Sequence, residues 1–269
     1  MLRRIATALV LFAAVAALLA AGRLAWAAGT ALVLLLGSGE WGRLCGLSGR
    51  ARWGYLSTTA ALCVAAILAH PAQWVFWQRA GIFAAAGFWV LLIPAWLARQ
   101  WRPRPPLAAA LLGWLLLFPT WFALIGLRDA GIVWLLLPLG AIWLSDIFAY
   151  FGGRLFGRTK LAIHISPKKT WEGLACGLLA VIAFALSLVA LGYTPPRIQP
   201  VWYLVPWLLL VAVMAALGDL FESMIKRQAG VKDSGQLLPG HGGVLDRIDA
   251  IIAGLPVAAA IGYAAGWLT

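Results

Sequence analysis

Long apolar runs separated by short polar stretches dominate the hydropathy pattern of this chain. An α-helix needs roughly 20 residues to cross a bilayer. Nine runs approach that length, at residues 5–22, 24–40, 54–69, 81–98, 107–126, 131–150, 173–193, 202–222 and 248–268, with the second and third the shortest. The pattern therefore predicts an all-α protein, a multi-pass transmembrane helical bundle with about nine spans.

Composition supports the same class. Hydrophobic residues make up 63% of the chain, the mean hydropathy is +0.91, and only 11% of residues are charged. A soluble globule has no interior large enough to hide so much apolar surface. The cysteines are odd in number and unpatterned, so we interpret Cys45, Cys63 and Cys176 as small buried side chains, without a disulfide or a zinc site.

The basic residues predict an orientation for these spans. With the N-terminus in the cytoplasm, 17 of the 21 lysines and arginines fall in cytoplasmic segments, as the positive-inside rule requires. We therefore predict a protein of the cytoplasmic (inner) membrane with a cytoplasmic N-terminus. The basic start could also belong to a secretory signal, but the apolar run that follows exceeds a signal core of about 7–15 residues, so an uncleaved span is favoured.

Motifs with catalytic or binding potential are unevenly distributed along the chain. Residues 1–130 carry no chemical motif and are predicted to form a scaffold of membrane helices with dimer contacts, whereas residues 131–269 are predicted to form a catalytic membrane region facing the cytoplasm. Glu40 and Trp41 are either an interfacial anchor pair or distant contributors to a site. The anchor is favoured, because tryptophan is enriched at the headgroup level, and the same explanation is extended to the sixteen tryptophans in general.

The longest polar passage, SMIKRQAGVKDSGQLLPGHGGVLDRID, runs from Ser223 to Asp249 between two apolar runs. Charged groups in such a place are costly unless they bind something, which makes this stretch the first functional-site hypothesis. Gly242 and Gly243 would let backbone amides approach phosphate groups closely. His241 is interpreted as a phosphate donor or a residue that fixes the loop, with a general base as the third alternative.

Acidic side chains on two neighbouring helices suggest a metal site. Asp219 and Ser223 are four residues apart and share a helical face, as do Asp246 and Asp249, which are three apart. A short hairpin would bring Asp219 close to Asp246. Carboxylates without a histidine or cysteine cluster favour Mg²⁺, with salt bridges that close the hairpin as the alternative. The surrounding bases suit a polyphosphate: Lys226, Arg227, Lys232 and Arg247.

An anion site is predicted upstream of this passage. Lys168 and Lys169 lie directly before a helix expected to start near Thr170, with Ser166 or Thr170 as its N-cap. A helix N-terminus with two lysines beside it favours bound anions, although a capped helix start with ordinary cytoplasmic lysines would look the same. Glu172 adds a hard oxygen donor.

Together these residues resemble the signature of the phosphatidate cytidylyltransferases, also called CDP-diacylglycerol synthases. The matching positions are Ser223-x-Ile225-Lys226-Arg227, Lys232-Asp233, Pro239-x-His241-Gly242-Gly243 and Asp246-Arg247-x-Asp249, preceded by Asp146, Ala149-Tyr150, Gly157, Lys160 and Ser166-Pro167-Lys168-Lys169-Thr170-x-Glu172-Gly173. The clear match covers about 100 residues. Ala175-Cys176 departs from it, since a glycine pair is expected there, and this affects helix packing behind the site.

The resemblance implies transfer of a cytidylyl group from CTP to phosphatidic acid, giving CDP-diacylglycerol and pyrophosphate, with Mg²⁺ required and a second cation or a homodimer as further family features. In this interpretation Asp219 and Asp246 bind the metal, and Asp249 is a third candidate. Lys226, Arg227, Lys232 and Arg247 would hold the triphosphate, Lys168 and Lys169 the lipid phosphate. Ser223, His241, Gly242 and Gly243 would complete the substrate contacts.

Two rival functions differ in class. An ion-coupled transporter would need polar residues deep in several spans and repeat symmetry, whereas here the acids gather at one surface. A CTP-dependent enzyme that acts on another lipid, such as a polyprenol kinase or an archaeol cytidylyltransferase, would share the site. Competition assays with alternative lipid acceptors would distinguish such an enzyme from one that uses phosphatidic acid. Membrane lipids are expected partners and nucleic acid is not.

Overall fold

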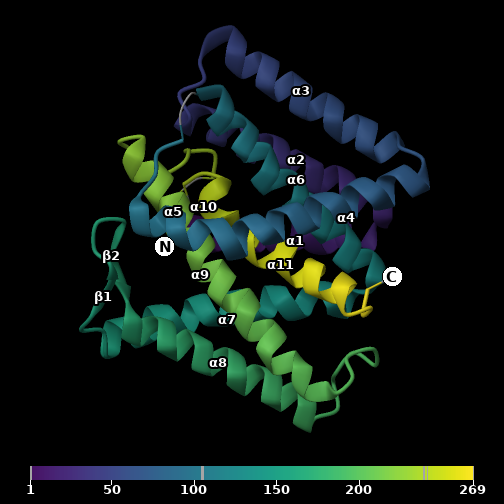
Figure 1. Cartoon of the computed structure of the whole chain (residues 1–269), viewed down its shortest axis with the longest axis vertical. Coiled ribbons are helices and arrows are strands. Elements are labelled where there is room, and N and C mark those ends of the chain that lie inside the picture. The colour runs from purple at the N-terminus through teal and green to yellow at the C-terminus, as the bar shows by residue number, and fades with distance from the viewer. Residues whose placement is uncertain (1, 104–105, 239, 241, 269) are drawn as a thin grey trace.

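The protein, described here by a computed structural model, is a bundle of apolar helices (Figure 1). Residues 2–103, 106–238, 240 and 242–268 are described. The elements are α1 (Leu2–Ala20), α2 (Arg23–Leu44), α3 (Gly49–Leu68), α4 (Pro71–Gly87), the π-helical turn η1 (Phe88–Leu92), α5 (Ile93–Arg99), α6 (Pro106–Ala130), α7 (Ile132–Leu155), β1 (Lys160–Ala162), β2 (Ser166–Thr170), α8 (Trp171–Ala190), the 3₁₀ turn η2 (Val201–Tyr203), α9 (Leu204–Gln228), α10 (Leu245–Ile248) and α11 (Ile251–Ala264).

The predicted all-α membrane class is confirmed. Seven helical segments in the described ranges are long and apolar enough to cross a bilayer: 23–44, 49–68, 71–99, 106–130, 132–155, 171–190 and 201–228. The described apolar parts of the first and last helices, Leu9–Ala20 and Ile251–Ala264, are shorter. The count of nine spans and the cytoplasmic N-terminus therefore stay predictions, as does the division at residue 130, where Gly131 separates α6 from α7.

Several helices extend beyond the apolar runs that predicted them, among them α4 and α9. The fourth begins at Pro71, whose missing N–H costs nothing at a helix start, and His70 caps it by accepting from the Ala72 amide at 3.4 Å. Helix α9 continues six residues past the predicted end at 222, to Gln228. The polar side chains of its last turns therefore stand on a rigid helix, which positions them far better than a loop would.

Buried tryptophans join the helices through hydrogen bonds. The indole N–H of Trp41 donates to the Ala109 carbonyl at 2.7 Å, and that of Trp121 donates to the Ala27 carbonyl at 3.0 Å, so both tie α2 to α6. Trp207 ties α9 to α11 in the same way. A buried indole N–H usually has an acceptor, and for these three a neighbouring helix supplies it. The prediction that the tryptophans are interfacial anchors is therefore wrong for these side chains.

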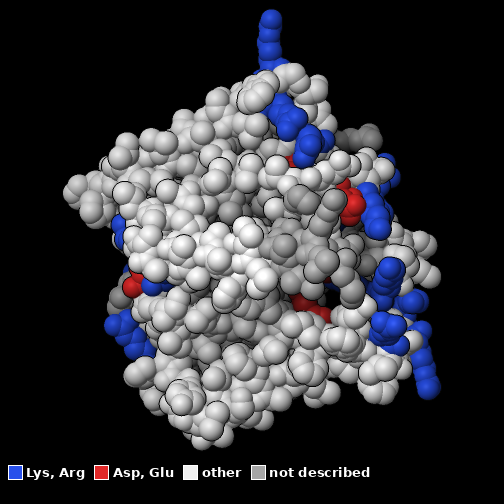
Figure 2. All heavy atoms as spheres, turned by 180° about the vertical axis from the view of Figure 1, so that it is seen from behind, with Lys and Arg blue, Asp and Glu red and all other residues white. Residues whose placement is uncertain are grey.

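The polar elements gather at one end of the bundle. In Figure 1, α5, α10 and the β1–β2 hairpin lie at the left, and the C-terminus lies at the right. Helix α3 runs along the outside, packs mainly on α2 and exposes large apolar side chains, as a lipid-facing helix would. Figure 2, seen from behind, shows lysine and arginine side chains mainly along one edge, with a smaller group at the opposite edge.

Candidate active site

The passage from Ser223 to Asp249 forms the last turn of α9, a loop and the short α10. Ser223 donates to Asp219 across one helical turn, Oγ to Oδ1 at 3.2 Å, which confirms that the two share a face. After α9 ends, Gly230 takes a left-handed conformation with φ of 74° and reverses the chain. The loop then returns to α10, which carries Asp246 back toward α9.

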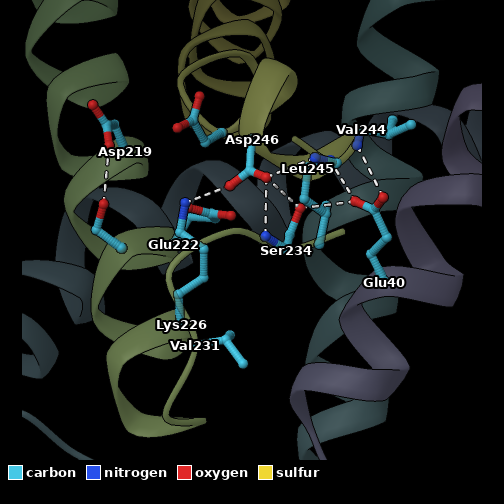
Figure 3. A network of polar contacts seen from close by, with 12 residues as sticks. Glu40, Asp219, Glu222, Lys226, Val231, Ser234, Val244, Leu245 and Asp246 are labelled. Atoms are coloured by element: carbon cyan, nitrogen blue, oxygen red, sulfur yellow. Dashed lines mark hydrogen bonds and ion pairs between the residues drawn. The ribbon is translucent and has the colours of Figure 1, made fainter. Parts of the chain in front are cut away.

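Asp246 is the most heavily hydrogen-bonded carboxylate among the described residues (Figure 3). Its Oδ1 lies 2.5 Å from the Lys226 ammonium. Its Oδ2 accepts from the amide and hydroxyl of Ser234, at 2.9 and 3.0 Å, and from the Gly243 amide at 2.8 Å. Burial alone would favour the neutral acid, but these donors hold the pKa of Asp246 below its usual value.

Lys226 is buried between two acids. Its ammonium lies 2.5 Å from the carboxylates of both Glu222 and Asp246, and only 8% of the residue is exposed. Glu222 is fully buried. Because Lys226 already neutralises protein groups, it cannot meet a triphosphate without leaving them. Its assignment to the nucleotide stays a prediction, and the structure gives it a second task, which is to hold α9 against α10.

The site includes one residue that the sequence interpretation set aside. Glu40 of α2 is only 3% exposed and accepts hydrogen bonds from Ser234 Oγ at 2.9 Å, the Val244 amide at 3.0 Å and the Leu245 amide at 2.9 Å. Trp41 is likewise buried. The interpretation of this pair as an interfacial anchor is therefore wrong, and the first part of the chain does reach the site.

We call Glu40, Glu222, Lys226, Ser234 and Asp246 the Asp246 cluster. In Figure 3, Glu40 and Lys226 approach the Ser234–Asp246 contact from opposite sides, one from α2 and the other from α9. A sequence signal for Glu40 did exist, since it is an acid in an otherwise apolar run. Its partners lie about 200 residues away, so nothing local could reveal them.

Asp219 stands in a more open place. Its Oδ2 lies 2.5 Å from the ammonium of Lys169 in β2, and the two side chains are 30% and 25% exposed. Asp146 of α7 lies within electrostatic range of both. Asp249, between α10 and α11, lies against α9 beside Asp219, since a Cβ at the adjacent Gly218 would lie 2.5 Å from the Asp249 carbonyl oxygen. We call Asp219 and Lys169 the Asp219 pair.

The β1–β2 hairpin presents the predicted anion-site lysines. Thr170 caps α8 by accepting from the Gly173 amide at 3.1 Å, which confirms the predicted helix start. Glu172 accepts from the amides of Arg158 and Thr159, each at 3.1 Å. The Glu172 oxygens thus hold the turn before β1 and are not free to bind a metal ion. Lys168 is exposed on the same strand that carries Lys169.

Small residues let α7 and α8 approach closely behind the site. A Cβ at Gly173 would lie 2.7 Å from the Ala149 carbonyl oxygen, and one at Gly177 would lie 2.6 Å from that of Ser145. A Cβ at Gly152 would collide with Cys176. The departure from the family pattern at Cys176 is therefore accommodated by a glycine on the facing helix, and it concerns packing, as expected.

The remaining predicted site residues differ in their surroundings. Arg227 donates to the Val231 carbonyl at 3.1 Å, while Lys232 and Arg247 are exposed at the surface. Gly242 has a φ of 82°, and its carbonyl oxygen accepts from the Leu238 amide at 2.9 Å. The Gly243 amide, predicted to approach a phosphate, donates to Asp246 instead. His241 lies outside the described residues.

Comparison with known proteins identifies the family. The cytidylyltransferase family model matches residues 2–264. A phosphatidate cytidylyltransferase of Pseudomonas aeruginosa is 37% identical over 278 aligned residues, which cover 87% of this chain and 86% of the relative. One from Thermotoga maritima is 44% identical over 132 residues, covering 48% of this chain and 49% of the relative. With a match across nearly its whole length, this chain belongs to the cytidylyltransferase family.

Proposed function

We propose that this membrane protein transfers the cytidylyl group of CTP to phosphatidic acid, giving CDP-diacylglycerol and pyrophosphate. The observation that carries the proposal is the pairing of Asp219 with Lys169 and of Asp246 with Lys226 at one end of apolar helices, with Asp249 beside Asp219. The name shared by the family relatives supports the same substrates.

The reaction needs positioning and charge neutralisation more than acid–base chemistry. A phosphate oxygen of the lipid attacks the α-phosphorus of CTP, and the bond from that phosphorus to the oxygen bridging the β-phosphate breaks, so pyrophosphate leaves. The lipid phosphate is already ionised near pH 7, so no general base is required. Cationic side chains that meet the phosphates supply the remaining stabilisation. We assign Lys168 and Lys169 to the lipid phosphate, and Arg227, Lys232 and Arg247 to the nucleotide.

The acids fit a magnesium ion held together with a nucleotide. Mg²⁺ is usually bound by one or two carboxylates plus substrate phosphates, not by a complete protein cage. Among the described residues no group of three or more acids, histidines or cysteines is arranged as a metal cage. Asp219 and Asp249 are close enough to interact and have hard oxygen donors, so we assign both to Mg²⁺, which would neutralise phosphate charge when bound.

The structure leads us to assign Asp246 a different role from the metal ligand that the signature suggested. Both of its oxygens already accept hydrogen bonds from protein donors, so it would have to give some of these up to bind a metal. We therefore propose that Asp246 shapes the loop beside the nucleotide. A role as a metal ligand remains the alternative, and the stability of the Asp246→Asn variant separates the two.

We further propose that the site faces the cytoplasm, where CTP is found. The uneven distribution of basic side chains in Figure 2 supports this orientation, as does the excess of lysine and arginine in the segments assigned to the cytoplasm. The expected homodimer stays a prediction, which light scattering on the detergent-purified protein would test.

The decisive experiment measures transfer of radiolabelled cytidylate from CTP to lipid by purified protein. We expect CDP-diacylglycerol and pyrophosphate to form with phosphatidic acid and Mg²⁺, and EDTA to stop both. A polyprenol and an archaeol phosphate are supplied in parallel, and the Asp129→Asn variant, altered at a surface ion pair with Arg23, is the control. Label entering another lipid but not phosphatidic acid would contradict the proposed substrate.

A further inference from the structure

Glu40 carries more hydrogen bonds than its position in an apolar helix requires. It lies near the C-terminal end of α2, where the helix dipole disfavours a negative charge. It is also 3% exposed, and a buried carboxylate is costly unless donors surround it. The donors come from one distant segment, the loop between α9 and α10 and the start of α10. Helix packing alone does not explain this arrangement, because an apolar residue would pack without the cost.

The contacts of Glu40 lead directly to Asp246. The Ser234 hydroxyl lies 2.9 Å from Glu40 Oε2 and 3.0 Å from Asp246 Oδ2, so its single proton is shared between the two carboxylates. The Val244 and Leu245 amides that donate to Glu40 directly precede Asp246 in the chain. Glu40 therefore holds the backbone on the near side of Asp246, while Lys226 holds its carboxylate from α9.

Two glycines show how closely the loop approaches Glu40. A Cβ at Gly243 would lie 2.5 Å from Glu40 Oε2 and would also collide with Ser234, and one at Gly235 would collide with Glu40. The Arg43 guanidinium, one turn along α2, donates to the Ser234 carbonyl at 3.5 Å. The end of α2 is thus fitted to this loop through both backbone and side-chain contacts.

We propose that Glu40 is a positioning residue for the cytidylyl transfer. It fixes residues 234–235 and 243–245 so that Asp246 and the loop beside the nucleotide keep their geometry, and it does not itself touch the substrates. The proposal rests on the proposed function for its kinetic consequence, but the contacts that it invokes can be tested without any substrate.

The test compares Glu40→Gln and Glu40→Asp with the wild type. Glutamine keeps the volume but turns an NH₂ group toward backbone donors, so we expect kcat to fall about 10- to 100-fold, with the KM for phosphatidic acid unchanged. Aspartate keeps the charge on a shorter side chain and should recover part of the rate. Hydrogen exchange of the Val244 and Leu245 amides should accelerate about tenfold or more in Glu40→Gln.

A double-mutant cycle separates positioning from a general loss of stability. If Glu40 acts through the Ser234 hydroxyl, the kcat losses of Glu40→Gln and Ser234→Ala will be less than multiplicative when combined. Trp26→Phe is the matched control, since it removes one buried hydrogen bond from the same helix, to the Leu124 carbonyl at 3.0 Å, far from the loop. It should lower the melting temperature and leave kcat unchanged.

Three results would overturn the proposal: a wild-type kcat in Glu40→Gln, unchanged amide exchange, or a fully multiplicative double variant. If the wild type itself transfers no cytidylate to phosphatidic acid, the proposed function fails instead. The exchange measurement then still decides whether Glu40 holds the segment, so the two failures are distinguishable.

Discussion

Asp219 and Asp246, both predicted as metal ligands, have opposite environments. Asp246 is held on both oxygens by a lysine, two amides and a hydroxyl, and its partner Glu40 is almost wholly buried. Asp219 is 30% exposed and meets one partly exposed lysine and one serine. A carboxylate with few and exposed partners can exchange them for a ligand at little cost. A carboxylate whose oxygens already accept several buried hydrogen bonds serves better as a fixed support.

This comparison suggests a division of labour within the site. The Asp219 pair, near Asp146 and Asp249, is the part that would change partners when substrates arrive. The Asp246 cluster is the part that would keep the loop in place while this happens. Substitutions in the two parts should therefore separate catalysis from stability.

The largest effect is expected from Asp219→Asn. It removes a charge from the open part of the site, so we expect kcat to fall about 1,000-fold, as when a group that stabilises the transition state is lost. The melting temperature should stay near that of the wild type, because an exposed ion pair contributes at most about 1 kcal/mol. Transfer assays and thermal unfolding in detergent measure both, with Asp129→Asn as the control. A strongly destabilised Asp219→Asn protein would contradict the division.

Asp246→Asn should lower both activity and stability. The change leaves Lys226 and Glu222 to share a buried site without the second carboxylate, and breaking a buried ion pair costs about 3–5 kcal/mol. We expect kcat to fall about 100-fold because the loop is misplaced, and the melting temperature to fall clearly. If the protein lost all activity but kept its melting temperature, Asp246 would be acting as a metal ligand instead.

How far these roles could be predicted from sequence depends on the distance between partners. Apolar run length predicted the helical class, and spacing predicted the Asp219–Ser223 contact and the Thr170 cap, since all are local. The Asp246 loop was located from its polar residues. Its partner Glu40 was only the less favoured alternative, because a buried contact between residues about 200 positions apart has no local pattern.

Other errors had a local physical cause. The apolar run that predicted α9 stops at 222, before the helix does, because charged residues end a hydropathy window without ending a helix. Tryptophan enrichment at interfaces is a general tendency, and it does not distinguish a lipid-facing indole from Trp41, whose acceptor lies on a neighbouring helix. The sequence did not predict the hairpin of β1 and β2, because its strands are only three and five residues long.

Lys169→Met should have a smaller effect on catalysis than either aspartate variant. Under the proposed function Lys169 meets the lipid phosphate, so we expect the KM for phosphatidic acid to rise about tenfold, the equivalent of one lost charge-assisted hydrogen bond. The melting temperature should hardly change, because the ammonium and its partner Asp219 are partly exposed. Initial rates against lipid concentration provide the measurement. An unchanged KM with a lower kcat would assign Lys169 to the nucleotide side.

The smallest effect is expected behind the site, at Cys176. Its side chain packs against Gly152 where α7 and α8 meet, so Cys176→Gly removes a contact and adds a flexible residue to a helix. The glycine in the helix alone lowers the free energy of unfolding by about 1 kcal/mol. We expect a lower melting temperature with kcat within about threefold of the wild type, since a packing change that leaves the polar contacts intact should not displace reacting groups. Thermal unfolding and transfer assays on the same preparation decide this. A large loss of activity would mean that the α7–α8 contact sets the position of Lys169 through the hairpin. The proposed division between the Asp219 pair and the Asp246 cluster would then be incomplete, because α7 and α8 would also belong to the site.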